Sequence, residues 1–345
     1  MQNAFKSFIG FRPGGNTSYL LQAETVSGMS LVDNAAALEV VFKKAGQGGK
    51  DEDFNPIRKF LQLRPYGNDI IRISLSSSPD PRPETASPML EMREFANCQL
   101  KPAEENGIQG FEDLGGRPRV IIRKEEFDYK QWRDDWPPKE VNSLGLDLYP
   151  DGETKVSFLP YDYFLPHLLF SVPLGLTMRG DEAAGCTFAF RCDPDESFCG
   201  TGERFSRINL AGRTVDLRNA DALGVNTPDC YKNIPFYLSS KGYGLFLHTS
   251  SYSRFSFGDV SHSAVMGYSE DPELDLFIIG GGCPEKVLYN YRCLTGFPPE
   301  LPVWSYGVWM SRLSYFSADE VTSVCQRMRE NKIPLDVIHL DTGWF

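Results

Sequence analysis

The chain has 345 residues, of which 41% are hydrophobic, 13% aromatic and 23% charged. This content can bury a large core and excludes a disordered chain, and the length suggests about two domains. The formal net charge of −11, from 46 acidic and 35 basic side chains, excludes an extended nucleic-acid interface, which needs a basic face.

The N-terminal residues contain no unbroken apolar stretch behind a basic segment, so the sequence predicts neither a signal peptide nor a membrane span. The eight cysteines form no Cys-x-x-Cys pair, and no histidine lies at ligand spacing. We therefore expect no metal site, no cofactor, reduced thiols and a cytoplasmic protein without a membrane or nucleic-acid partner. The sequence leaves homo-oligomerisation open.

Short apolar or alternating runs, separated by Gly, Pro, Asn and Asp, predict an all-β region up to about residue 282. Asp151-Gly152 and Lys241–Gly244 predict hairpin turns between such runs. Many strands at this spacing are typical of a β-sandwich. The runs are Ile70–Leu75, Val120–Arg123, Leu144–Leu148, Lys155–Phe158, Thr187–Arg191, Phe236–Ser239 and Leu245–His248.

A short helix with proline at its first position is predicted for Pro284–Arg292, and it should end near Gly296. The Pro-rich residues 296–302 predict a connector. We therefore place a sandwich domain with a terminal helix at 1–295, the connector at 296–302 and a second domain at 303–345.

The last segment predicts a strand, a helix and a second strand. Val303–Met310 is an aromatic and β-branched run suited to a buried strand, and Ser317–Glu320 matches a capping box that starts a helix. A hydrophobic strand, Leu335–Leu340, then delivers Asp341. Such a unit, ending in an acid, is typical of a (β/α)8 barrel, whose chemistry lies where the strands end. The apolar face of the helix consists of Val321, Val324, Cys325 and Met328.

Two features suggest chemistry that the sequence does not support. Gly200–Phe205 begins like a dinucleotide fingerprint, but it lacks the third glycine and a following helix, which favours a turn. His248 and His339 lie inside predicted strands, where structural roles are favoured. The spacing identifies no Ser/His/Asp arrangement.

Five segments come in the order and spacing of glycoside hydrolase family 31. They are Gly202–Phe205, Tyr231–Tyr237, Gly242–Gly244, Leu301–Gly307 and His339–Phe345. From about residue 200 onward the chain resembles this family, and it is more similar to the α-xylosidase branch than to the α-glucosidases. The resemblance implies a galactose-mutarotase-like β-sandwich followed by the first strand–helix–strand of a (β/α)8 TIM barrel, truncated after the second strand.

The family resemblance also implies an activity, namely that of a retaining α-glycosidase that hydrolyses α-xylosides or α-glucosides in carbohydrate metabolism. Such enzymes place two carboxylates about 5–5.5 Å apart, one as nucleophile and one as acid/base. Family members carry both after later barrel strands, so we expect residues 1–345 to contain no catalytic residue. Alone, they should hydrolyse no aryl α-glycoside and should aggregate through uncovered sheet edges. The alternatives are a non-catalytic carbohydrate-binding or interaction module, and α-glucan lyase chemistry.

The same resemblance implies four substrate-binding positions. Asp341 matches an acid that accepts hydrogen bonds from sugar hydroxyls, and an ionised carboxylate can accept two at once. Thr342 borders the C5 substituent of the sugar, and Leu313 stands where some relatives place an aromatic. Asp221 resembles an acid that the sandwich extends toward the leaving group. The alternative roles are a cap on the next loop for Asp341 and a solvated loop acid for Asp221.

Overall fold

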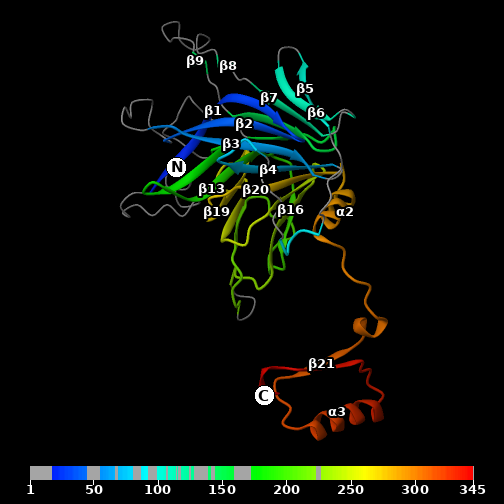
Figure 1. The fold of residues 1–345 in the computed structure, drawn as a ribbon. Helices are drawn as coiled ribbons and strands as arrows, with labels where there is room; N and C mark the ends of the chain where they lie inside the picture. The colour runs from blue at the N-terminus through cyan, green and yellow to red at the C-terminus, as the bar shows by residue number, and fades with distance from the viewer. Residues whose placement is uncertain are drawn as a thin grey trace. The chain divides into compact units, whose positions relative to one another are not determined.

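The computed structural model describes residues 18–44, 55–66, 69–80, 87–91, 99–105, 108–113, 115, 118–123, 126–127, 139–140, 144–158, 172–222 and 227–344. The chain divides into two compact units, residues 1–296 and residues 297–345 (Figure 1). The expectations for the first 17 residues and for Cys98 lie outside the described residues. Among the described residues, no helix has the length and apolar character that a membrane crossing requires.

An antiparallel sheet of thirteen described strands forms the body of the first unit, in the order β14-β16-β17-β20-β4-β3-β2-β1-β12-β13-β19-β18-β15. The strands are β1 (Ser18–Val32), β2 (Ala35–Lys44), β3 (Ile57–Pro65), β4 (Ile70–Ser76), β12 (Leu174–Arg179), β13 (Glu182–Arg191), β14 (Phe198–Gly202), β15 (Arg213–Leu217), β16 (Asn233–Ser239), β17 (Tyr243–Leu247), β18 (Ser253–Phe257), β19 (Ala264–Ser269) and β20 (Asp275–Gly280). Each predicted run that falls in this sheet overlaps one of these strands.

The two edges of this sheet approach each other. Arg204, which follows β14, donates from Nη2 to the carbonyl of Asp216 in β15 at 2.6 Å. Beyond these strands, Asn219 and Cys230 form a parallel bridge. The sheet therefore curls toward a barrel and encloses part of the core.

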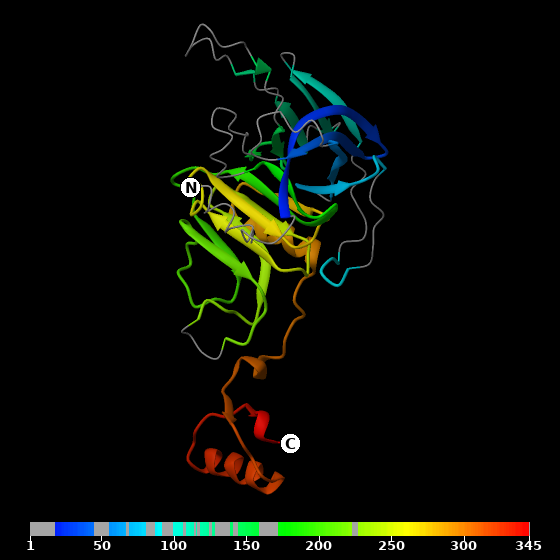
Figure 2. The same cartoon turned by 90° about the vertical axis from the view of Figure 1, so that its left-hand side faces the viewer.

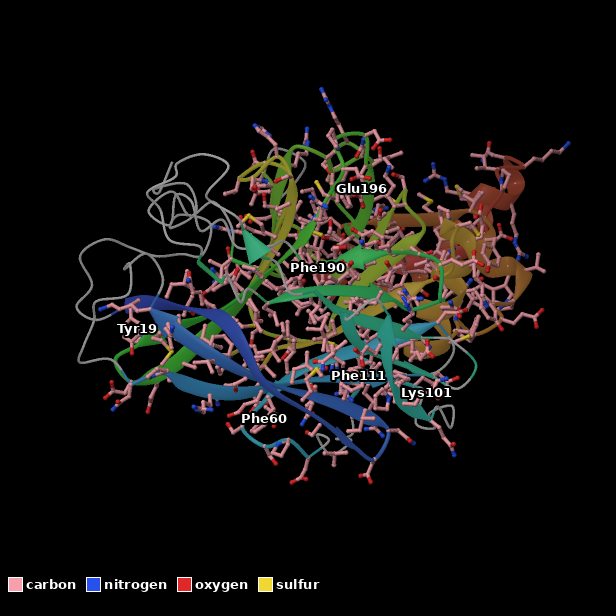
Figure 3. The ribbon with its side chains drawn as sticks, turned by 90° about the horizontal axis from the view of Figure 1, so that it is seen from above. Tyr19, Phe60, Lys101, Phe111, Phe190 and Glu196 are labelled. Carbon is pink, nitrogen blue, oxygen red and sulfur yellow. The ribbon has the colours of Figure 1, made fainter. Side chains whose placement is uncertain are left out.

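A second, smaller sheet covers the large one. Its order is β11-β10-β7-β6-β5, and a separate two-stranded sheet pairs β8 with β9. Figure 3 shows Phe111 of this layer and Phe190 of the large sheet in the interior, and both belong to one hydrophobic core. The two layers form the predicted β-sandwich. The strands are β5 (Leu100–Glu105), β6 (Ile108–Asp113), β7 (Arg119–Arg123), β8 (Glu126–Phe127), β9 (Lys139–Glu140), β10 (Gly145–Tyr149) and β11 (Val156–Ser157).

The predicted hairpin at Asp151-Gly152 joins β10 to β11. Gly152 has a φ of 84°, which glycine adopts without strain. Asp151 accepts hydrogen bonds from the backbone N–H groups of Glu153 at 3.0 Å and Thr154 at 2.6 Å, and from that of Gly281 at 2.9 Å. Burial opposes ionisation of this carboxyl, but the hydrogen bond from the Thr154 hydroxyl at 2.6 Å, followed by these backbone bonds, holds the pKa of Asp151 below its usual value.

The predicted short helix is α2 (Pro284–Thr295), with proline in its first turn and Gly296 at its C-terminus. Helix α2 lies against the large sheet (Figure 2), and its buried residues are Val287, Asn290 and Leu294. Val287 and Leu294 belong to a core cluster with residues of β16, β17 and β20. Asn290 donates to the carbonyl of Gly280 in β20 at 2.8 Å. The helix thereby closes one face of the first unit.

The second unit contains a parallel pair of strands joined by a helix, namely β21 (Trp309–Arg312), α3 (Ala318–Glu330) and β22 (Val337–Leu340). The predicted N-cap is confirmed, because Ser317 Oγ accepts the N–H of Glu320 at 3.1 Å. The Glu320 carboxylate reaches back as in a capping box, but it accepts the N–H of Phe316, one residue before the cap, at 2.8 Å. The predicted apolar stripe is also confirmed. The half-buried residues of α3 at its positions are Val321, Val324, Cys325 and Met328.

The continuous buried strand expected at Val303–Met310 is wrong. Val303–Tyr306 forms a 3-10 helix, η2, and the strand starts only at Trp309. Pro302 starts the turn, because its carbonyl accepts both the N–H of Ser305 at 3.0 Å and the Ser305 hydroxyl at 2.7 Å. Local hydrogen bonding therefore overrides the β propensity of the run, and Val303 is 88% exposed.

Candidate functional site

The carboxyl ends of β21 and β22 bring three of the four predicted site residues together. The strands are parallel with Arg312 opposite Leu340, so both end at the same edge. Leu313 follows the first strand, and Asp341 follows the second. The N–H of Gly343 donates to the Leu313 carbonyl at 3.0 Å and ties the two strand ends together. A side chain at position 343 would lie 2.7 Å from that carbonyl oxygen, so glycine permits this close approach.

Asp341 presents one carboxylate oxygen for binding. Its Oδ1 accepts the backbone N–H of Thr342 at 2.7 Å, and it has no further hydrogen-bond partner among the described residues. Thr342 starts a 3-10 turn, η3 (Thr342–Trp344), and is exposed. Leu313 is 66% exposed. The local cap that was the alternative role of Asp341 is therefore present, and it leaves Oδ2 able to accept a ligand hydroxyl.

The amino ends of the same strands are held by a different acid. Asp336 accepts the N–H of Val308 at 2.8 Å through Oδ2, and its own N–H donates to the Val308 carbonyl at 3.0 Å. A side chain at Gly307 would lie 2.1 Å from the same Oδ2. These contacts set the register of β21 and β22 and thereby the position of Asp341.

The fourth predicted residue, Asp221, lies in the first unit. It is exposed and accepts a hydrogen bond from the phenol of Tyr231, which is 60% exposed. The loop that carries Asp221 is anchored where it meets the sheet. The side-chain oxygen of Asn219 accepts the backbone N–H of Asn233 at 3.0 Å and its side-chain amide at 2.8 Å. Asp221 therefore stands on an anchored loop and contacts a phenol.

The Gly200–Phe205 motif is a bulged end of β14 and not the turn that the sequence favoured. Gly200, Thr201 and Gly202 have positive φ values of 121°, 66° and 98°. The pairing with β16 shifts register between Gly200 and Gly202. A Cβ at Gly202 would lie 2.0 Å from the carbonyl oxygen of Lys232. No helix follows the motif in residues 203–217, all of which are described.

Sequence reasoning missed a buried polar network in the first unit. Arg72 donates from Nε and Nη2 to the two carboxylate oxygens of Asp275, both at 2.8 Å. His248 Nδ1 donates to Asp275 at 2.8 Å, and its Nε2 lies 2.7 Å from the hydroxyl of Ser87. Burial opposes ionisation, but the bonds from Arg72 and His248 hold the pKa of Asp275 below the usual carboxyl range. Ser87 and His248 are 161 residues apart in the chain, and Arg72 and Asp275 are 203 apart. No local sequence pattern indicates such distant contacts.

A metal centre has no support in the part of the chain that the structure describes. No group of three or more His, Cys, Asp or Glu side chains is arranged to hold an ion there. The acids at the candidate site, Asp341 and Asp336, lie at opposite ends of a strand pair. The arrangement at the carboxyl end can accept hydroxyl hydrogen bonds.

Comparison with known proteins identifies the family. Residues 61–255 match the glycosyl hydrolase 31 N-terminal galactose mutarotase-like domain. The chain belongs to glycosyl hydrolase family 31. Residues 298–345 match the TIM-barrel domain of this family, so the β21-α3-β22 unit falls within the matched region. The family resemblance inferred from the five sequence segments is thereby confirmed.

Curated family 31 relatives include α-xylosidases and an α-glucosidase. α-Xylosidase XylQ of Lactiplantibacillus pentosus is 39% identical over 152 residues, which are 44% of this chain and 20% of the relative. Alpha-glucosidase 2 of Bacillus thermoamyloliquefaciens is 30% identical over 287 residues, which are 81% of this chain and 32% of the relative. The chain spans about a fifth of the length of the α-xylosidases that it matches.

Solved structures of family 31 share the fold. A GH31 α-xylosidase from a soil metagenome, complexed with xylose, superposes with a TM-score of 0.63 at 19% identity, covering 90% of this chain and 41% of the other. A Flavobacterium johnsoniae GH31 dextranase complexed with glucose gives a TM-score of 0.65 at 19% identity, covering 94% and 34%. At these identities the likeness concerns the fold alone.

Proposed function

We propose that this chain is the N-terminal part of a retaining α-glycosidase that hydrolyses α-xylosides or α-glucosides. In this proposal, residues 1–295 are the sandwich domain, 296–302 the connector and 303–345 the start of the catalytic barrel. The observation that carries it is the position of Asp341. Its free carboxylate oxygen lies at the carboxyl end of a parallel strand, where barrel enzymes bind their substrates.

Asp341 is proposed to bind the hydroxyls of the sugar whose glycosidic bond is cleaved. Hydrogen bonds from hydroxyls to a carboxylate that tighten in the transition state stabilise it by several kcal/mol. Asp341→Ala in the full-length enzyme should therefore lower kcat/KM for an aryl α-glycoside by about two orders of magnitude or more. Asp319→Ala, which removes an exposed acid from the first turn of α3, is the matched control and should leave kcat/KM unchanged.

Circular dichroism of both variants should match that of the parent. Near-normal kcat/KM in Asp341→Ala would reduce Asp341 to the local cap of Thr342 that the structure already contains. A large loss in both variants would point to a folding defect of the barrel and would count against the proposed role.

The preferred substrate is proposed to be the α-xyloside. Xylose and glucose differ by one hydroxymethyl group at C5, and a pocket separates such increments by about 10–200-fold in kcat/KM. The branched side chain of Thr342 fills space near C5 and favours the pentoside, while Leu313 in place of an aromatic favours the hexoside. The higher identities to α-xylosidases support the pentoside. Parallel kcat/KM values for aryl α-xyloside and α-glucoside test this choice, and a glucoside preference above tenfold would overturn it.

Hydrolysis and lyase chemistry are distinguished by the source of oxygen in the product. A hydrolase transfers one oxygen atom from water to the anomeric carbon of the released sugar, whereas elimination adds none. In water enriched in the heavy oxygen isotope, the product should gain one labelled oxygen with retained anomeric configuration. An unlabelled product would favour the lyase alternative.

The proposed location of the enzyme is the cytoplasm. Its support is that the seven described cysteines all carry free thiols, which suits a reducing compartment. Burial raises the pKa of the Cys186 thiol far above its usual range and that of Cys192 to about 11, so neither is a reactive thiolate. Fractionation of the native cells should recover the enzyme with the cytoplasm, and recovery outside the cell would contradict this location.

A further inference from the structure

The first unit contains a polar cavity of about 820 Å³ at one end of its curled sheet. The ends of β15 and β19, the starts of β16 and β18 and the segment after β17 line it together with Met89. One of its lining residues, Leu217, also belongs to the hydrophobic core. A volume of this size lies within the usual range of ligand pockets, about 300–1,000 Å³.

The walls of this cavity are held in place without a ligand. Met89 belongs to a segment that the Ser87–His248 contact ties to the sheet at 2.7 Å. The phenol of Tyr252 donates to Asp216, and Arg254 donates to the same carboxylate at 2.5 Å. Burial, and then the bond to Asp216, raises the pKa of Tyr252 to about 12, so its hydroxyl stays neutral. A preformed pocket avoids the entropic cost of ordering its walls on binding.

One hydroxyl that lines the cavity, that of Ser253, has no protein partner in the described part of the chain. Ser253 is 2% exposed, and on β18 it shares the inner face with Phe255 and Phe257. Its hydroxyl forms no hydrogen bond to another residue that the structure describes. Its oxygen is not among the fully buried unpaired atoms of the described residues, so the hydroxyl is open to the cavity and can donate to, or accept from, a molecule bound there.

Among the described residues, the cavity lining contains one basic and one acidic side chain. Arg218 and Glu270 both line it, both are exposed, and neither makes a side-chain hydrogen bond or ion pair within the described residues. Together with the hydroxyls of Ser253 and its neighbours they offer donors and acceptors without net charge. This combination disfavours a phosphate, which needs excess positive charge, and suits a neutral molecule with many hydroxyls.

We propose that this cavity binds a neutral, α-linked oligosaccharide, with Arg218, Glu270 and Ser253 hydrogen-bonding sugar hydroxyls. The α-linkage rests on the proposed function, whereas the class of ligand follows from the cavity itself. Tyr252 also lines the cavity, and its ring is fixed by the Arg254 guanidinium, which lies 5.8 Å from the ring centroid.

The test is calorimetric titration of the full-length enzyme carrying Asp341→Ala, which suppresses turnover, with maltotriose and isomaltotriose, and with inorganic phosphate as the anionic probe. Saturable binding of at least one trisaccharide is expected, without binding of phosphate. Arg218→Ala and Glu270→Ala should each raise Kd by about tenfold or more, since each removes hydrogen bonds to a charged group. The matched controls are Arg213→Ala and Glu182→Ala, which remove exposed charges that do not line the cavity and should leave Kd unchanged.

Several outcomes would overturn the proposal. These are no saturable binding of either trisaccharide, equal Kd values in the cavity variants and the controls, or preferential binding of phosphate. The four replaced side chains are exposed, so all four variants should fold. Thermal melts check that a raised Kd does not come from unfolding. Binding is measured without turnover, so its failure leaves the proposed hydrolysis standing. Conversely, loss of hydrolysis in Asp341→Ala with trisaccharide binding intact separates the two sites.

Discussion

Removing Arg72 should destabilise the first unit strongly. The side chains of Arg72 and Asp275 are 7% and 5% exposed, and they form a bidentate pair between the neighbouring strands β4 and β20. Arg72→Met keeps most of the side-chain volume but leaves the Asp275 carboxylate buried without its main partner. Breaking one side of a buried ion pair costs about 3–5 kcal/mol. For a domain of this size, such a loss lowers Tm by about 6 °C or more.

The double variant Arg72→Met, Asp275→Leu separates the pair from the charge that is left behind. The double variant removes both charges, and apolar replacement of a buried ion pair often changes stability little. Its Tm should therefore lie closer to the Tm of the parent than the Tm of either single variant does. Thermal unfolding followed by circular dichroism at a β-sheet wavelength measures all four proteins. A shift below about 2 °C in Arg72→Met, or losses that simply add in the double variant, would refute this reasoning.

The same pair predicts the pH dependence of stability. Because the pKa of Asp275 is lowered in the folded state, its contribution is present above the ordinary carboxyl range, and it is lost as pH falls through the folded pKa. The parent should therefore lose Tm more steeply than the double variant below about pH 4. Equal slopes for the two proteins would show that Asp275 titrates normally.

Three further substitutions test local features. Ser317→Ala removes the side-chain cap of α3 and should cost about 0.5–2 kcal/mol, measured as lost helical signal and a lower Tm of the second unit. Gly202→Ala should cost about 1–3 kcal/mol from its positive φ, and more from the 2.0 Å approach to a backbone carbonyl. Its control, Gly212→Ala, also has a positive φ but meets nothing within 4 Å, so equal losses would rule out the clash. Asp151→Ala leaves the N–H and hydroxyl of Thr154 unpaired and should lower the free energy of unfolding by about 1–3 kcal/mol. This difference from the parent should shrink at acid pH, because the Asp151 carboxylate of the parent is then protonated.

Features specified within a few residues of sequence were predicted well. The capping box at Ser317 and the stripe from Val321 to Met328 place α3 correctly, because both depend on helical spacing alone. The Asp151-Gly152 hairpin is confirmed for the same reason, since its turn is made by its own residues. The strand predicted over Val303–Tyr306 was wrong, because local hydrogen bonds to Pro302 outweighed the β propensity of the run.

Features that depend on strand order could not be predicted. Arg72 meets Asp275 because β4 and β20 are neighbours in the sheet, although they are far apart in the chain. The candidate site is intermediate in this respect. The parallel order of β21 and β22 follows from one helix between two strands, so the meeting of Leu313 and Asp341 was accessible from the sequence. The cavity was not, because its lining comes from four strand ends, the segment after β17 and the segment at Met89.

The contacts among Ser87, His248 and Asp275 have the lengths of a nucleophilic triad, at 2.7 Å and 2.8 Å, but the charge around Asp275 argues for a structural role. When the serine of a triad attacks, its proton passes to the histidine, and the carboxylate stabilises the imidazolium that forms. Here Arg72 occupies both carboxylate oxygens, so Asp275 offers an imidazolium little net negative charge. The hydroxyl of Ser87 also accepts the N–H of Met89 at 3.2 Å. The network therefore fastens the wall of the cavity to β17 and β20, and the structural role that the sequence favoured for His248 agrees with its partners.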